Sequence, residues 1–158
     1  MKKGFSLPVW VAGAARSAVK KLVGLPFENY EPIKIPNEQK EIKIEIHSVG
    51  LLKKDSKALG ISFAKSGLDL DITQNLEIWA IASLEKISFN NSVQKNPINI
   101  IAGSGVGINK NTSAICISDF AKEVIAHISK FCVMSRSKPD FAKVIPNACE
   151  SSLSKPTE

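Results

Sequence analysis

The sequence is poor in the residues from which metal sites and disulfide networks are built. Its 158 residues include three cysteines, Cys116, Cys132 and Cys149, and two histidines, with no Cys-x-x-Cys pair. An odd number of widely spaced cysteines argues against a disulfide framework or a zinc site, and it fits the reducing environment of the cytoplasm. We therefore expect a cytoplasmic protein without a metal site.

Aromatic residues and long apolar segments are also scarce. One tyrosine and two tryptophans supply little material for a surface on which nucleic-acid bases stack. The net charge is +6, but the lysines are scattered, with no basic block longer than Lys20-Lys21 or Lys53-Lys54. This pattern favours a solvated basic surface over a nucleic-acid patch. No apolar run reaches the ~18–20 residues that span a bilayer, so we expect neither nucleic acid nor a membrane as a partner.

The N-terminal region has two possible interpretations. Two lysines precede the apolar run Phe5–Ala15, as in a signal peptide. However, Pro8 lies early in this run, and apolar residues continue at helical spacing beyond Arg16. An amphipathic helix from about Pro8 to Val23, ended by Gly24, explains the whole pattern better.

The next segment predicts a β-hairpin. Isoleucines alternate with polar residues at 33–35 and 42–46, and a period of two indicates strands with one buried face. The intervening Pro36-Asn37-Glu38 is typical of a turn. His47 continues the polar side, so we expect it at the surface.

The rest of the chain predicts further strands, a second helix and an irregular end. Alternation favours strands at 59–64 and 76–87, and the nearly continuous apolar run 98–102 is typical of a buried strand. Ser118 is placed to cap a helix with Asp119 in its first turn. The expected buried face of that helix consists of Phe120, Val124, Ile128 and Phe131.

These elements indicate a fold of the α/β class, more exactly of the α+β type. We predict a mixed or mostly antiparallel sheet covered by an N-terminal and a C-terminal helix. The domain should comprise residues 1–134. Residues 135–158 are rich in serine and proline, and we expect an irregular, disordered tail there.

Alternating glycines follow directly on the apolar run 98–102. Gly103, Gly105 and Gly107 allow the backbone to take positive φ and to approach a ligand closely. Successive N–H groups in such a turn can hold a carboxylate or a phosphate. The spacing fits neither the dinucleotide-binding motif nor the Walker motif, and a purely structural turn remains the alternative.

A second candidate is the pair Asp69 and Asp71. In an extended segment both carboxylates lie on one side, roughly 6–7 Å apart along the chain, and Thr73 continues that side. Such a pair can bind a cation, orient an amine or transfer protons; a polar loop between strands is the alternative. No nucleophile–base pair is recognisable, and His127 has no evident partner in the sequence.

These segments, in this order and spacing, resemble the N-terminal part of the CbiD proteins. The opening Gly4–Ala15 resembles their Gly–aromatic–Thr/Ser step and Ala-rich helix. Residues 67–73 are similar to their Gly-Asp-Asp-Pro-Asp-Val-Thr motif, although Leu68 and Leu70 replace an Asp and the Pro. Residues 103–107 resemble their Gly-x-Gly-Val-Gly motif. The segment 7–10 departs from the Thr-Gly-Thr-Cys of many members.

The resemblance implies a function. The family methylates C1 of the corrinoid ring in anaerobic cobalamin biosynthesis, with S-adenosylmethionine as methyl donor, and converts cobalt-precorrin-5B to cobalt-precorrin-6A. It implies no identified catalytic residue, but it implies that the motif residues contact substrate or methyl donor, namely Asp69, Asp71, Thr73, Gly103, Gly105 and Gly107.

The resemblance ends near Phe131, and family members are more than twice as long. We therefore expect a fragment of the family enzyme, unable to turn over if the missing part completes the ligand site. The alternative is a non-catalytic module that binds a corrinoid or another anion.

Overall fold

The computed structural model describes residues 5–35, 41–52, 56–65, 73–86, 98–112, 115–125 and 140–149. A second helical segment, residues 119–125, follows strand β6. Within the described residues, no helix is long and apolar enough to cross a membrane. The labelled elements, in chain order, are α1 (Leu7–Leu22), β1 (Tyr30–Lys34), β2 (Glu41–Glu45), β3 (Ser48–Leu52), β4 (Lys57–Phe63), β5 (Glu77–Lys86), β6 (Ile98–Ile100) and β7 (Asp140–Cys149).

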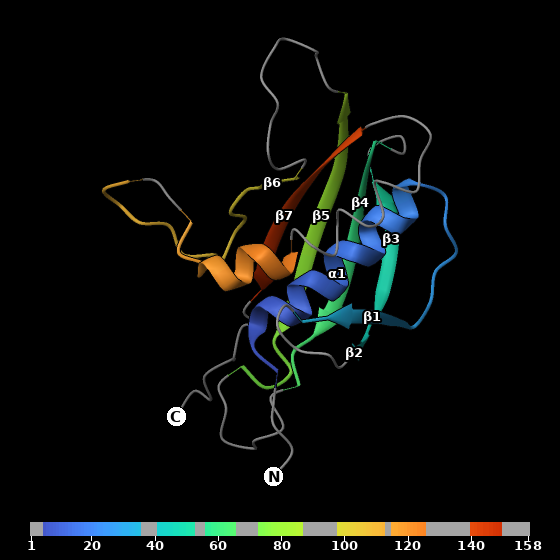
Figure 1. Cartoon of the computed structure of the whole chain (residues 1–158), viewed down its shortest axis with the longest axis horizontal. Helices are drawn as coiled ribbons and strands as arrows, with labels where there is room; N and C mark the ends of the chain where they lie inside the picture. The colour runs from blue at the N-terminus through green and yellow to red at the C-terminus, as the bar shows by residue number, and fades with distance from the viewer. Residues whose placement is uncertain are drawn as a thin grey trace, which may run out of the picture.

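Two sheets form the β part of the fold. Five strands make the larger sheet in the order β3-β4-β5-β7-β6, and β1 and β2 form a separate hairpin. All the pairs are antiparallel except β6 with β7, which is parallel. Helix α1 lies across the larger sheet, and the 119–125 helix lies beside it (Figure 1). The predicted α+β class, with a mostly antiparallel sheet and two helices, is confirmed.

Helix α1 has the start and stop signals that its sequence predicts. The N-cap is Ser6, in an extended conformation, and a proline occupies the first turn. Lys20 and Lys21 lie in the last turn, where positive charge favours the helix dipole. Gly24 follows with a φ of 77°, a left-handed conformation that glycine adopts without strain. The predicted helix is confirmed to within one residue at each end.

Small residues let α1 approach both sheets closely. A Cβ atom added at Gly60 of β4 would lie 2.1 Å from the Ala14 carbonyl oxygen of α1, and one added at Gly13 would lie 2.6 Å from Ile44 Cγ2. The facing positions of the larger sheet are also small, since Ala58, Ala80 and Ala82 are fully buried. This contact fixes the helix between the hairpin and the larger sheet.

The hairpin carries the predicted alternation. Ile33, Ile42 and Ile44 are buried in the core with Ile35 and Ile46, and Ile33 lies opposite Ile42 in the register. His47 is exposed, as predicted. The turn predicted at Pro36-Asn37-Glu38 lies outside the described residues.

One carboxylate is buried between α1 and β1. Glu31 is 1% exposed and accepts hydrogen bonds from Arg16 Nε and Lys20 Nζ, each at 3.0 Å. Lys20 also contacts Glu28 at 2.8 Å. Burial alone would lower the pKa of Lys20, but the hydrogen bonds to Glu28 and Glu31 outweigh it and raise that pKa above its usual value. The hydrogen bond from Lys20 lowers the pKa of Glu28.

Three predictions about the second half of the chain are wrong in part. Residues 140–149, expected to be irregular, form strand β7 between β5 and β6. The run 98–102 yields only the three-residue strand β6, at the edge of the sheet. In the 119–125 helix Phe120 is 42% exposed, and the buried residues are Ala121, Val124 and Ile125.

Long-range pairing explains the strand that the sequence does not signal. Strand β7 pairs along ten residues of β5, with Ala80 opposite Pro146. Among the described residues, β6 pairs with residues 142–144 of β7 and not with Pro146, and proline is tolerated at the edge of a sheet. The later part of the predicted second helix lies outside the described residues, and this part includes His127, Ile128, Phe131 and Cys132.

Candidate functional site

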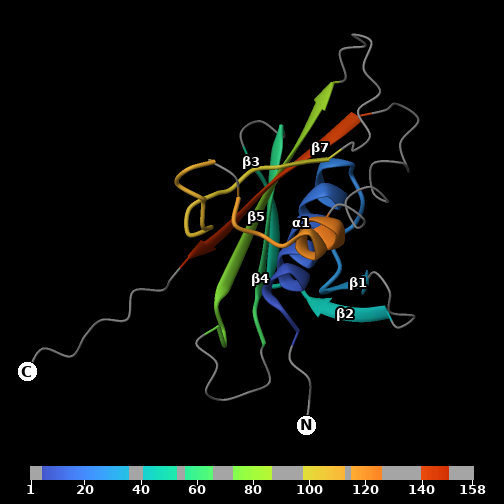
Figure 2. The ribbon, with the colours of Figure 1, turned by 60° about the vertical axis from the view of Figure 1, so that its left-hand side comes forward.

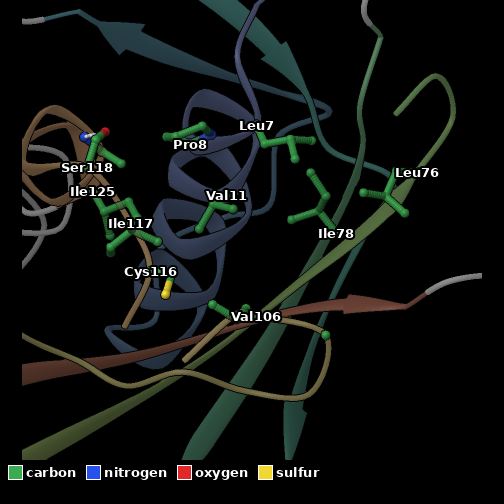
Figure 3. A pocket seen from close by; sticks show the side chains of 13 residues that line it. Leu7, Pro8, Val11, Leu76, Ile78, Val106, Cys116, Ile117, Ser118 and Ile125 are labelled. Atoms are coloured by element: carbon green, nitrogen blue, oxygen red, sulfur yellow. Dashed lines mark hydrogen bonds between the residues drawn. The ribbon is translucent and has the colours of Figure 1, made fainter. Parts of the chain in front are cut away.

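A cavity of about 320 Å³ opens between the start of α1, the start of β5 and the 103–118 region. Figure 3 shows Leu7, Pro8 and Val11 of α1 on one side, with Val106 and Cys116 of the loop region across from Val11. The described lining residues are Leu7, Pro8, Val11, Leu76, Ile78, Gly105, Val106, Gly107, Cys116, Ile117, Ser118, Ala121 and Ile125.

The glycine-rich loop forms one wall of this cavity. A turn closes where the Val106 N–H donates to the Gly103 carbonyl at 3.2 Å, and Gly105 within it has a φ of 78°. The loop then meets the returning chain, because the Cys116 N–H donates to the Gly107 carbonyl at 2.8 Å. Positive φ at Gly105 is therefore a requirement of the turn, and a side chain there would be strained.

The 119–125 helix and the residue before it form a further part of the cavity wall. Ser118 is its cap, since its Oγ accepts a hydrogen bond from the Ala121 N–H at 3.1 Å. Ala121 and Ile125, one helical turn apart, are buried and face the cavity. The predicted cap is confirmed, and it fixes Ser118 at the cavity wall.

The cavity is chemically apolar. None of the described lining residues carries a charge, and the polar side chains among them are those of Ser118 and Cys116. Cys116 is a free, exposed thiol. Within the described ranges, no group of three or more His, Cys, Asp or Glu side chains is placed to hold a metal ion. The cavity can therefore bind and orient an uncharged group, and it supplies no acid–base pair.

A smaller hollow of about 180 Å³ lies elsewhere, lined by Glu45, His47, Phe63, Lys65 and Asn75. Lys65 and Glu45 form an ion pair across it. The rings of His47 and Phe63 meet edge to face with centroids 5.0 Å apart. Asn75 has a φ of 61°, a conformation that asparagine tolerates better than most residues.

Comparison with known proteins decides the family. The sequence profile of the CbiD family matches residues 1–146, which is most of the chain. The chain belongs to the CbiD family. The match includes α1, β1 to β6, the glycine-rich loop and most of β7.

The relatives of this CbiD chain include proteins named cobalt-precorrin-5B C(1)-methyltransferase. Those of Prochlorococcus marinus strains MIT 9312 and MIT 9215 are 85% and 84% identical over 125 residues, which is 79% of this chain and 34% of each relative. The relative from strain NATL2A is 39% identical over 126 residues. The chain thus spans about a third of the length of the curated relatives that it matches.

A solved structure shares the fold. The crystal structure of the cobalamin biosynthesis protein cbiD from Archaeoglobus fulgidus superposes with a TM-score of 0.63 at 16% identity. The match covers 92% of this chain and 43% of that chain. At this identity the likeness shows the fold alone.

The structure of this CbiD chain brings together part of the site predicted from the sequence. Gly105 and Gly107 line the cavity, whereas Gly103 contributes its carbonyl to the turn. Thr73 opens the turn before β5, and its carbonyl accepts a hydrogen bond from the N–H of the lining residue Leu76 at 3.1 Å. Asp69 and Asp71 lie outside the described residues, and their role stays a prediction.

Sequence reasoning did not identify the residues that complete the cavity. Leu7, Pro8 and Val11 were interpreted only as the start of an amphipathic helix. An available signal was the position of Leu7 and Pro8 in the segment 7–10, which departs from the family's Thr-Gly-Thr-Cys; Val11 follows that segment directly. Ile117 gave no signal of its own, because its place in the cavity depends on pairing between Gly107 and Cys116.

Proposed function

We propose that this chain carries part of a cobalt-precorrin-5B C1-methyltransferase and that the cavity beside Gly105 and Gly107 binds a ligand of that reaction. The observation that carries the proposal is the 85% identity over 125 residues to a protein of that name. The substrate is a cobalt-corrinoid, the methyl donor is S-adenosylmethionine, and the reaction takes place in the cytoplasm.

The apolar cavity suits this chemistry. An electron-rich ring carbon takes a methyl group from a sulfonium, so that a C–C bond forms as the S–CH₃ bond breaks. When bound, S-adenosylmethionine supplies this methyl group and leaves as S-adenosylhomocysteine. Such a transfer depends on orientation and exclusion of water more than on proton transfer. The side chains of Val11, Val106 and Ile78 would exclude water, and the glycines would let the ligand approach the backbone.

The size of the cavity limits what it holds. Ligand pockets usually measure roughly 300–1,000 Å³, and a cavity of about 320 Å³ is at the lower end. It fits one uncharged part of a ligand rather than a whole macrocycle together with the methyl donor. The carboxylates of the corrinoid would then lie outside it, where the net charge of +6 favours their approach. We propose Asp69, Asp71, Thr73 and the three loop glycines as further contacts.

A pair of substitutions tests the cavity in an intact enzyme. The background is a chimera in which the matched segment of this chain replaces that of the MIT 9312 relative. Val106→Trp places an indole in the cavity, whereas Ile108→Trp places one two residues away at a site that is 52% exposed and does not line it. We expect Val106→Trp to lower methyl transfer from labelled S-adenosylmethionine at least about tenfold, equivalent to 1.4 kcal/mol.

The control variant should transfer methyl groups at the unaltered rate, and both variants should melt at the unaltered temperature. Equal activities of the two variants would show that the cavity takes no part in the reaction. They would leave the assignment to the family intact.

A further inference from the structure

The two faces of the larger sheet carry different side chains, and the packing of the two helices accounts for the side chains on one face only. In an antiparallel ladder, directly paired residues point to the same face and successive residues to opposite faces. The pairs Ala58–Ala82, Gly60–Ala80 and Ser62–Ile78 lie under α1, where the side chains are buried and, except for Ile78, small. The intervening pairs point to the other face.

That other face carries large apolar side chains. Leu59 pairs with Ile81 and Ile61 pairs with Trp79, while Phe63 continues the row on β4. We call these five residues the open face. None of them is buried, and each is partly accessible to solvent. The helices and the hairpin lie together on the opposite side of the sheet (Figure 2). No described helix therefore covers the open face, and the His47 ring contacts it only at its Phe63 end.

The open face has the apolar composition that is usual for a sheet face packed against other protein. An antiparallel sheet with one wet face usually alternates apolar and polar residues. Here β4 and β5 are apolar on both faces over their central residues, and charged residues occur at the edge of the patch, as Lys57 and Glu77. A contiguous apolar patch with a polar rim marks a protein contact surface. The hollow at Phe63, with the Glu45–Lys65 ion pair, continues this rim.

We propose that the open face is the docking surface for the part of the CbiD chain that lies outside the matched region. Two lengths support this occupant. The matched segment is 34% of the P. marinus relatives and 43% of the A. fulgidus structure, so more than half of each protein is available to cover it. The family match, 1–146, includes both strands of the face. The inference rests on family membership and does not depend on the proposed reaction.

The test compares the 158-residue chain with the chimera of the matched segment and the remainder of the MIT 9312 relative. Ile61→Lys places a charge on the open face, and Leu25→Lys places one at a site that is 41% exposed, in the loop after α1. In the isolated chain both lysines reach water and should shift the melting temperature little. In the chimera a lysine at position 61 would be buried unpaired, and we expect a loss of about 10 °C or more; Leu25→Lys should remain neutral.

Hydroxyl-radical footprinting of the unaltered proteins keeps the test valid if the Ile61→Lys chimera does not fold. Phe63 and Trp79 should oxidise severalfold faster in the isolated chain than in the chimera. Trp10, buried on the other side of the sheet, should be protected in both. Equal effects of Ile61→Lys in the two proteins, or equal oxidation, would overturn the proposal. Light scattering could instead show that the isolated chain forms dimers while its open face is protected from oxidation. That result would also overturn the proposal, because a second copy of the chain would then cover the face.

Discussion

Helix α1 packs closely on β4 at Gly60, and this contact yields a quantitative prediction. Gly60 has no side chain, and a Cβ atom at this position would lie 2.1 Å from the Ala14 carbonyl oxygen and 2.5 Å from Ser17 Oγ. The Ser17 hydroxyl can rotate, although it would lose its 2.8 Å hydrogen bond to the Ala14 carbonyl. The carbonyl oxygen belongs to the helix backbone, so Gly60→Ala must displace α1 itself.

The expected magnitude follows from the cost of overpacking. Extra methyl groups in a packed core usually cost ~1–3 kcal/mol, and occasionally more. Because the clash is with a backbone atom, we expect a loss near the top of this range, about 3 kcal/mol. At 2–4 °C per kcal/mol for a chain of this size, the melting temperature should fall by roughly 6–12 °C. Urea unfolding followed by far-UV circular dichroism measures the free energy directly.

Gly50 provides the matched control on the neighbouring strand β3. Nothing lies within 4 Å of a Cβ atom added there. Alanine in a strand is favoured over glycine by roughly 0.5–1 kcal/mol, so Gly50→Ala should leave stability unchanged or slightly higher. If Gly60→Ala and Gly50→Ala unfold at the same urea concentration, α1 does not pack on β4 as described.

Further predictions concern the buried carboxylate and the acidic segment. Glu31→Gln leaves two cations facing a neutral group and should lower the free energy of unfolding by about 3 kcal/mol. Glu28→Gln removes an exposed partner of Lys20 and should lower it much less; urea titration of both variants distinguishes these outcomes. The pKa of Lys20 is raised in the folded protein, so the stability that Lys20 contributes is complete below pH 10.5 and is lost as pH rises through the folded pKa. Above pH 10.5 the melting temperature of the wild-type protein should therefore fall more steeply than that of Lys20→Met, which thermal melts at several pH values would measure. Asp71→Ala in the chimera should reduce methyl transfer much more than stability, and an equal loss of both would exclude a ligand-binding role.

Local signals in the sequence predict the first half of the fold well. The boundaries of α1 follow from the cap at Ser6, the proline in the first turn and the glycine at 24. The hairpin and the strands β4 and β5 follow from alternation with a period of two. These features depend on residues that are neighbours in sequence, so their physical causes are visible without the tertiary structure.

The second half depends on pairing between distant residues. Strand β7 contains Pro146 and lies in a serine- and proline-rich region, yet the exposed edge of β5 provides its partner. The helical spacing of Phe120 and Val124 predicts that Phe120 lies in the core, but the cavity-facing side of the helix is occupied by Ala121 and Ile125. In both cases tertiary context outweighs local preference.

The candidate site shows the same division. The glycine motif gave Gly105 and Gly107, because alternating glycines after an apolar segment have a direct conformational meaning. The opposite wall, formed by Leu7, Pro8 and Val11, lies almost 100 residues away in sequence and is brought there only by the packing of α1. Its residues are ordinary helix-core residues by pattern, so no periodicity argument would distinguish them.

The most direct test of the central claim is methyl transfer by the chimera that joins the matched segment of this chain to the remainder of the MIT 9312 relative. The assay would follow label from S-adenosylmethionine into cobalt-precorrin-5B, with the unaltered relative measured in parallel. If this chain carries a working part of the methyltransferase, the chimera should form the methylated corrinoid at a rate within about tenfold of the relative, a difference below 1.4 kcal/mol in the barrier. A chimera that folds with the same melting temperature and transfers no methyl group would contradict the account.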